Sequence, residues 1–325
     1  MTLLSVENLA VEFTVDEGTF RAVDDVSFRI SRGESLGLVG ESGCGKSVTA
    51  LALTRLIPSP PGRIASGSVH FQGRDLLGLK PHALRAVRGN DISMIFQEPL
   101  SALSPLHRVG RQMTEGLGFH SSMTKKEARQ YALSWLEKVG IPDARHRIDS
   151  YPFQLSGGMQ QRVMIAMALM LSPGLIVADE PTTALDVTTQ AQIFRLITEM
   201  KQNETALLLI THDMGVVWEM CDRVIVMYAS RIVESAAIEE IFSRPCHPYT
   251  IGLLEAIPKL AGGRNYLKDI AGQVPSPLNY PQGCNFQERC EQAFDRCRME
   301  TPELVECGED HLAACFLAYP GGGRS

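Results

Sequence analysis

Apolar positions in the first part of the chain alternate with polar ones at the spacing of strands. Residues 3–13 carry Val, Leu, Val and Phe in a loosely alternating pattern, and residues 22–30 repeat it after an Asp-Glu-Gly turn. Residues 35–39 are mostly apolar and lead directly into a glycine-rich loop. The next segment, residues 47–57, has helical composition and stops before a run of prolines. The pattern therefore predicts three strands and a helix.

Continuous apolar runs characterise the middle of the chain. Residues 175–178, 206–210 and 224–227 are such runs, as expected of parallel strands that are covered on both faces. A helical segment, residues 188–201, lies between the first two, and residues 98–171 are mainly helical in pattern. One apolar stripe in this helical region consists of Ala128, Tyr131, Ala132, Trp135, Leu136 and Val139. Strands that alternate with helices predict an α/β fold with a parallel sheet.

Length and the loss of pattern near residue 236 indicate two domains. The 325 residues exceed one average domain. We predict an α/β core over residues 1–235, with a helical subdomain at about 98–171. From residue 236 to residue 325 the chain is rich in Pro, Cys and Gly, with short amphipathic pieces, and is predicted to be a small C-terminal extension.

Charge and hydropathy exclude several classes of function. The net charge of −6 and pI near 5.8 provide no basic field for nucleic acid, so no nucleic-acid partner is expected. No apolar run approaches the length of a membrane span, and no signal peptide is visible at the N-terminus. Any role at a membrane is therefore expected to come through a partner.

A glycine-rich motif follows the third predicted strand and opens the first predicted helix. It consists of Gly40, Glu41, Ser42, Gly43, Cys44, Gly45, Lys46 and Ser47, which match G-x-x-x-x-G-K-[ST]. Glycines allow successive N–H groups to face phosphates, and the helix adds its positive end. Lys46 is expected to bind the β- and γ-phosphates, and Ser47 to bind Mg²⁺. The sequence predicts a nucleotide phosphate site.

Polar residues at the ends of three other strands are candidate partners of this loop. Asp179 ends the run at 175–178 and suits Mg²⁺, and the adjacent Glu180 could polarise an attacking water. Gln97 follows a short apolar segment, and its amide could bind Mg²⁺ and water. His212 follows the strand at 206–210 and could touch a γ-phosphate. Taken singly, each has an ordinary explanation as a capping, solvated or core residue.

Residues 155–162 read Leu-Ser-Gly-Gly-Met-Gln-Gln-Arg and precede a predicted helix, a second anion-binding position. This octet resembles the signature sequence of the ABC ATPase family, and the other motifs occur in that family's order. The resemblance implies an ABC-type P-loop NTPase that binds ATP and Mg²⁺ and works as a dimer. The signature residues that would contact the nucleotide of the opposing subunit are Ser156, Gly157, Gly158 and Gln160.

The resemblance also implies individual roles. Gln97 is similar to the residue that links nucleotide to the membrane partner, Glu180 to the general base and His212 to the switch histidine. Residues 184–186 resemble the family's D-loop, which places Asp186 at the dimer interface. An aromatic that stacks on adenine is expected to be Phe13, with Phe20 as the alternative.

Several further segments resemble the ATPase subunits of dipeptide, oligopeptide and nickel importers. These segments are residues 19–30, 94–99, 247–250 and 274–277 and the cysteine-rich tail. The resemblance implies a peripheral protein at the cytoplasmic face of the inner membrane that powers transport. Its implied partners are a second homologous ATPase subunit, two membrane permeases and, indirectly, an extracytoplasmic substrate-binding protein. Peptides are the favoured cargo; a nickel complex, an opine or a non-transport role are alternatives.

Five of the eight cysteines lie in the last part of the chain. Four of them are Cys284, Cys290, Cys297 and Cys315; they contain no C-x-x-C pair, so zinc-ribbon spacing is absent. Four thiolates suit an iron–sulfur cluster or zinc, and unligated thiols are a third reading. The tail resembles that of peptide-importer ATPases in which a [4Fe–4S] cluster occurs, which favours the cluster. The fifth, Cys307, is expected to take no part.

Overall fold

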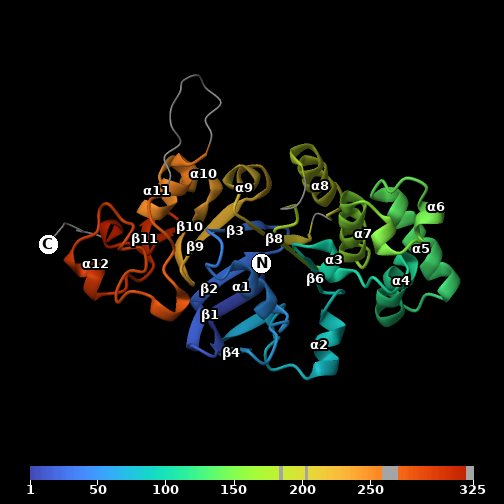
Figure 1. Cartoon of the computed structure of the whole chain (residues 1–325), viewed down its shortest axis with the longest axis horizontal. Coiled ribbons are helices and arrows are strands. Elements are labelled where there is room, and N and C mark those ends of the chain that lie inside the picture. Colours follow the sequence, from blue (N-terminus) through green and yellow to red (C-terminus); the bar gives the residue numbers. More distant parts are fainter. Residues whose placement is uncertain (183–185, 202–203, 258–269, 320–325) are drawn as a thin grey trace, which may run out of the picture. The chain divides into compact units, whose positions relative to one another are not determined.

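The computed structural model describes the chain except residues 183–185, 202–203, 258–269 and 320–325. The chain divides into two compact units (Figure 1). The helical unit comprises Met1, residues 31–34 and residues 78–208; the sheet unit comprises residues 2–30, 35–77 and 209–325. Among the described residues, no helix combines the length and apolar character needed to cross a bilayer.

The sheet unit contains two groups of hydrogen-bonded strands. One is a sheet in the order β2-β1-β4-β5, whose strands are β1 (Thr2–Val15), β2 (Gly18–Ser31), β4 (Gly62–Phe71) and β5 (Arg74–Asp75). The other has the order β11-β12-β10-β9-β3, whose strands are β3 (Ser35–Val39), β9 (Arg223–Tyr228), β10 (Arg231–Ala237), β11 (Val305–Gly308) and β12 (His311–Ala313). Strands β3 and β9 are parallel, and β3 is buried along its whole length, as its apolar sequence predicts.

Short helices connect these strands. They are α1 (Lys46–Leu53), α9 (Met214–Met220), α10 (Ile238–Ser243), α11 (Pro248–Glu255) and α12 (Asp295–Met299), with single turns at Pro277–Asn279 and Phe316–Ala318. The C-terminal extension adds the hairpin β11–β12, and β12 pairs antiparallel with β10. The extension is therefore part of the sheet unit's own hydrogen bonding.

The helical unit contains the parallel pair β6–β7 and most of the longer helices. Its elements are α2 (Pro81–Val87), β6 (Ile92–Ile95), α3 (Pro99–Ala102), α4 (Val109–His120), α5 (Lys125–Lys138), α6 (Ala144–Arg147), a turn at Pro152–Gln154, α7 (Gly157–Leu169), β7 (Leu175–Asp179) and α8 (Val187–Met200). Strand β8 (Ala206–Thr211) carries the chain from this unit into the other. The helices α4, α5 and α7 pack together (Figure 1).

Helix α5 shows why the helical region could be recognised from its pattern. Thr124 and Glu127 form a capping box, in which the Thr124 hydroxyl accepts from the Glu127 N–H and the Glu127 carboxylate accepts from the Thr124 N–H. The predicted apolar stripe faces inward: Ala132 and Leu136 are fully buried, and the Tyr131 hydroxyl donates to the Met170 carbonyl. The prediction of a helical segment here is confirmed.

Three details differ from the sequence-based expectation. Helix α1 ends at Leu53 rather than at residue 57, because Arg55 adopts a left-handed φ of 54° that breaks the helix. Strand β4 was not expected, since its Gly and Ser residues have low strand propensity. Hydrogen bonding to β1, which sets Val6 opposite Val69, holds the segment in the strand conformation. Strand β10 was also not expected, and it runs across the domain boundary predicted after residue 235.

Candidate active site

The glycine-rich motif forms the turn between β3 and α1 in the sheet unit. Gly40, Gly43 and Gly45 have φ values of 152°, 81° and 104°, which favour glycine. A side-chain carbon at Gly40 would collide with the Met227 carbonyl, and one at Gly45 would collide with the Ala22 carbonyl. The loop therefore passes close to the backbone of β9 at Gly40 and of β2 at Gly45, and only glycine fits at these two positions.

Lys46 is the first residue of α1 and lies under the loop. Only 5% of its surface is exposed, and its Nζ donates to the carbonyls of Gly40 at 2.8 Å and Glu41 at 3.0 Å. Ser42 and Gly43 are exposed, whereas Cys44 is buried and burial raises the pKa of its thiol. Ser47 lies half-buried in the first turn of the helix. The motif thus places a single cation and a helix N-terminus at one turn, which is the chemistry of an anion site.

Two residues of the C-terminal part hold the second residue of this loop. The Glu41 N–H donates to the Tyr249 hydroxyl at 2.9 Å. The Arg289 guanidinium binds the Glu41 carboxylate through both nitrogens, at 2.6 and 3.0 Å. Arg289 also donates to the carbonyls of Ile270 and Ala271, and its side chain is only 5% exposed. Hydrogen bonding to the Glu41 carboxylate raises the pKa of Arg289, so the guanidinium stays charged.

Neither Arg289 nor Tyr249 was among the predicted site residues. Arg289 precedes Cys290 in an irregular segment, and no periodic pattern marks it. Tyr249 lies in the segment 247–250 that carries the family resemblance, which was the one available signal. Their contact with the loop arises from tertiary structure alone.

The two candidate adenine-stacking aromatics lie together in the β1–β2 hairpin. Phe13 and Phe20 are half-buried, with ring centroids 5.9 Å apart and planes 19° apart. They form one stacked pair in the same sheet as Ala22, which lies against the phosphate loop. Of the other sheet-unit candidates, His212 follows β8 and is exposed, and Asp213 next to it caps α9.

The acidic strand end lies in the helical unit. Asp179 ends β7 and is 6% exposed, and Glu180 follows with a left-handed φ of 43°. Such a φ is uncommon for a non-glycine residue and is concentrated at functional positions. The Gln97 side-chain amide donates to the Glu180 carboxylate at 3.3 Å. Because β6 and β7 are parallel neighbours, their ends bring Gln97 and Glu180 together.

The signature octet forms the start of α7. Ser156 caps the helix, with its hydroxyl accepting from the Met159 N–H at 3.4 Å, and both Ser156 and Gly157 are exposed. The Gln160 amide is buried and donates to the carbonyls of Pro152 and Leu155 at 2.9 and 3.1 Å. Gln160 thus shapes the turn before the helix rather than facing solvent.

Gln161 connects α7 to the acidic strand end. Its buried amide donates to the carbonyl of Pro181, the residue that follows Glu180. Sequence reasoning assigned no role to this side chain. This hydrogen bond connects α7, whose N-terminus is exposed, to the segment that follows β7 within the helical unit.

Asp186 caps helix α8, close to the signature. Its carboxylate accepts from the hydroxyls and the N–H groups of Thr188 and Thr189, and the hydroxyl hydrogen bonds above all hold the pKa of Asp186 well below its usual range. A side-chain carbon at Gly158 would lie 3.6 Å from Thr189, so the starts of α7 and α8 are neighbours. Residues 184 and 185 of the predicted D-loop lie outside the described residues.

The four predicted ligand cysteines gather in the extension. Cys284, Cys290, Cys297 and Cys315 line one small pocket, and the Cys284 N–H donates to the Cys297 carbonyl at 2.8 Å. Burial raises the pKa of Cys284 to about 12 and that of Cys315 to about 11, and neighbouring thiols act in the same direction. Phe286 and Phe316 also line this pocket. Four cysteines that line one small pocket offer thiol ligands of the kind that an iron–sulfur cluster or zinc takes.

Comparison with protein families yields two matches along the chain. Residues 23–183 match the ABC transporter family, and residues 233–297 match the oligopeptide/dipeptide transporter C-terminal region. The first match includes the phosphate loop, Gln97, the signature and the acidic strand end. The second includes Tyr249, Arg289 and three of the four clustered cysteines.

Known proteins resemble this chain over nearly its whole length. The oligopeptide transport ATP-binding protein AppD of Bacillus subtilis is 48% identical over 317 residues, which cover 97% of each chain. The oligopeptide transport ATP-binding protein OppD of Escherichia coli is 48% identical over 315 residues, 97% of this chain and 93% of the relative. Among solved structures, the dimeric ATP-binding cassette MJ0796 in a post-hydrolysis state bound to ADP and Pi matches with a TM-score of 0.65 and 27% identity. The match covers 72% of this chain and 98% of that one.

Proposed function

Because the chain belongs to the ABC transporter family of ATP-binding proteins, we propose that it hydrolyses ATP to power a peptide importer. The family, the P-loop NTPase fold and the ATPase class predicted from the sequence are confirmed by this membership. One observation carries the proposal: a single chain contains both the ABC match and the peptide-transporter C-terminal region. Peptide cargo rests on relatives that are named as oligopeptide transport proteins.

The phosphate loop is proposed to bind the nucleotide. Lys46, held at the loop by two carbonyls, would turn its charge to the β- and γ-phosphates, while the N–H groups at the start of α1 bind the remaining oxygens. The Phe13–Phe20 pair offers an aromatic surface for adenine. We assign Mg²⁺ to Ser47, Gln97 and Asp179 on the chemistry of their oxygens; when bound, the ion neutralises phosphate charge.

Hydrolysis is proposed to use Glu180 as general base. Its carboxylate is oriented by the Gln97 amide and by the left-handed backbone at its own position. Such a group accepts a proton from the attacking water, while His212 is proposed to contact the γ-phosphate. Gln97 is proposed to couple the nucleotide site to the surface of the helical unit that faces the membrane partner.

The signature is proposed to complete the site of a second subunit. Ser156, Gly157 and Gly158 present the capped N-terminus of α7, and Ser156 and Gly157 are exposed, so a partner's phosphates can approach them. Asp186, at the neighbouring start of α8, is proposed to lie at the same interface. The partner is expected to be a second homologous ATPase subunit, which gives a heterodimer.

An exposed apolar group on the helical unit is the proposed permease contact. Leu106 is 80% and Phe153 66% exposed, Phe153 stacks on Tyr151 at 5.5 Å, and Arg108 lies over the Tyr151 ring. One of the two membrane permeases would bind there, and an extracytoplasmic substrate-binding protein would deliver cargo to the permeases. The protein would then be peripheral at the cytoplasmic face of the inner membrane.

The decisive experiment compares two helix caps in the complex reconstituted with both permeases. Ser156→Arg in each contributing subunit should abolish ATP hydrolysis and peptide uptake, because it blocks the N-terminus of α7. Thr124→Arg, which alters the cap of α5 outside the nucleotide motifs, should leave both activities largely intact. Full activity of the Ser156→Arg complex would refute the proposal of two shared sites.

A [4Fe–4S] cluster is proposed for the pocket lined by Cys284, Cys290, Cys297 and Cys315. Anaerobically purified protein should contain iron and acid-labile sulfide, and Cys290→Ser should lose both. Cys221→Ser, at a buried cysteine outside the pocket, is the control. Bound zinc without sulfide would show that the pocket is a zinc site. Wild-type protein that is fully stable without metal would show that the four cysteines are unligated thiols.

A further inference from the structure

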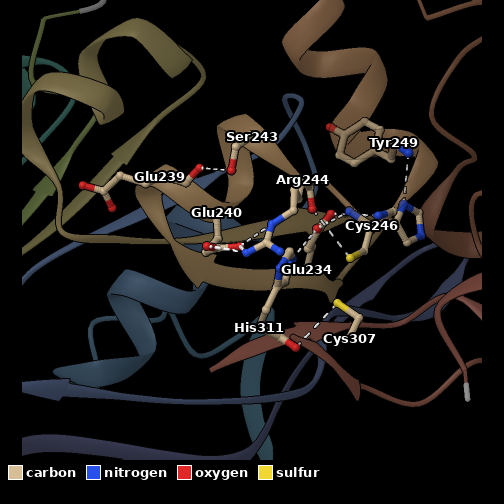
Figure 2. Close-up of polar contacts among 10 residues, drawn as sticks. Glu234, Glu239, Glu240, Ser243, Arg244, Cys246, Tyr249, Cys307 and His311 are labelled. Atoms are coloured by element: carbon tan, nitrogen blue, oxygen red, sulfur yellow. Dashed lines mark hydrogen bonds and ion pairs between the residues drawn. The ribbon is translucent and has the colours of Figure 1, made fainter. Parts of the chain in front are cut away.

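A second group of sulfur and nitrogen ligands lies outside the four-cysteine pocket. Cys246 lies between α10 and α11, Cys307 lies on β11, and His311 begins β12. One ligand atom of each lies within 4.8 Å of the others, and Figure 2 shows the two sulfurs facing each other above the β11–β12 hairpin. None of the three lines the pocket of the other four cysteines. Cys307, expected to take no part, therefore has partners of its own.

A buried carboxylate orients this group. Glu234 of β10 is fully buried, and its carboxylate accepts from the Cys246 N–H at 2.6 Å and the His247 N–H at 2.9 Å. It also lies 2.7 Å from Nε2 of His311, which is 2% exposed (Figure 2). Because a carboxylate accepts, Nε2 is the ring nitrogen that donates to Glu234, which leaves Nδ1 as the nitrogen that could bind a metal. Histidines that bind metals typically donate their second nitrogen to such a carboxylate.

We propose that Cys246, Cys307 and His311 bind one Zn²⁺ ion, with Glu234 as the carboxylate that orients the histidine. Two thiolates and an imidazole are the ligand types that zinc prefers, and two thiolates balance its charge. Zinc bond lengths of about 2.0–2.3 Å place tetrahedral ligand atoms roughly 3.4–3.8 Å apart, so the three ligand atoms, which lie within 4.8 Å of one another, would move closer together on binding. Water fills the fourth position.

The ion would join segments that are distant in sequence. It fixes the hairpin β11–β12 to the loop before α11, and the next residues of that loop lead to Tyr249, which contacts Glu41 of the phosphate loop. In the structure the two thiols hydrogen-bond to each other, and they also contact carbonyl oxygens, Cys246 that of Arg244 at 3.7 Å and Cys307 that of His311 at 3.5 Å. Metal binding would replace these contacts with strong bonds and stabilise the extension.

The test uses the full chain, purified under reducing conditions and stripped of metal with a chelator. Titration with Co²⁺ should produce thiolate-to-cobalt charge-transfer absorption, which Zn²⁺ then displaces. Cys246→Ser and Cys307→Ser should each lose one bound ion per chain relative to the wild type. Glu234→Gln should retain the ligands but weaken Zn²⁺ binding about 10- to 100-fold.

Three controls separate this site from its alternatives. Cys290→Ser should keep the ion, because its thiol belongs to the other pocket, and Cys221→Ser should match the wild type. In the Cys290→Ser background, Zn²⁺ should raise the melting temperature, and this rise should be lost when Cys307→Ser is added. Unchanged cobalt binding in both serine variants would overturn the site. A disulfide between Cys246 and Cys307 that resists the reducing agent would overturn it as well.

Discussion

Residues 40–47 of the phosphate loop are consecutive, whereas the groups that meet in the C-terminal extension come from residues 234 to 315. The loop needs one turn, three glycines in unusual conformations and a helix start. The extension needs a hairpin, a sheet edge and an ordered loop before its thiols approach one another. The chemistry of a local motif can thus be read from consecutive residues, whereas the residues of a dispersed site come together only on folding.

The two regions are nevertheless connected at Glu41. Its side chain pairs with Arg289 and its N–H with Tyr249, both from the C-terminal part. The difference between local and dispersed construction therefore predicts a graded response. Changes inside the loop should act most strongly on nucleotide binding, and changes in the extension should act through the support that they give to the loop.

The largest effect is expected from Lys46→Ala. Loss of a charge-assisted contact to phosphate should weaken ATP binding about 10- to 100-fold, as measured by titration with a fluorescent ATP analogue. Lys201→Ala is a matched control, because the Nζ of Lys201 also donates to a backbone carbonyl, that of Gly33 at 3.1 Å. Equal affinities in wild type and Lys46→Ala would remove the loop from the nucleotide site.

An intermediate effect is expected from Arg289→Met. The variant leaves the partly buried Glu41 carboxylate without its cation, which should lower the free energy of unfolding by about 1–3 kcal/mol and weaken ATP binding several-fold. Chemical denaturation and nucleotide titration measure the two effects. Arg195→Met, which removes an exposed pair with Glu199, should change neither.

A double variant that removes both charges of the Glu41–Arg289 pair sharpens this prediction. Glu41→Gln combined with Arg289→Met should recover part of the lost stability, since no charge is then left unpaired. If the double variant is as unstable as Arg289→Met, the contribution of Arg289 comes from its bonds to Ile270 and Ala271 instead.

The smallest effect is expected from Tyr249→Phe. It deletes the hydroxyl that accepts from the Glu41 N–H and should cost about 1 kcal/mol in thermal or chemical unfolding, with a smaller loss of ATP affinity than in Arg289→Met. Tyr131→Phe, which loses a hydroxyl bond to the Met170 carbonyl in the other unit, should cost similar stability without any change in affinity. A larger loss of affinity than in Arg289→Met would reverse the predicted order.

The same contrast explains what could be predicted from the sequence. Strands β3 and β7 and the start of α7 follow from apolar runs and contiguous motifs, so the fold was foreseeable. The sequence placed Gln97 and Glu180 at strand ends, but it did not predict the hydrogen bond between them. Strand β4 depends on its pairing with β1, and the end of α1 depends on the conformation of Arg55, neither of which local composition reveals.

The dispersed contacts were the hardest to predict. Arg289 reaches Glu41 across most of the chain, and Cys246 meets Cys307 only because β12 pairs with β10. A spacing rule could collect the four tail cysteines, which do line one pocket, but it passed over a histidine and two cysteines with no regular interval.

The pairing of β12 with β10 also limits how far the polypeptide can be shortened. Ser235 pairs with Leu312, Glu234 with Ala313, and the Ala314 N–H donates to the Val233 carbonyl. A truncated protein that stops soon after β10 would expose those backbone groups along an unprotected strand margin, a template for intermolecular β-association. Trimming the C-terminus should therefore yield insoluble material rather than a minimal ATPase.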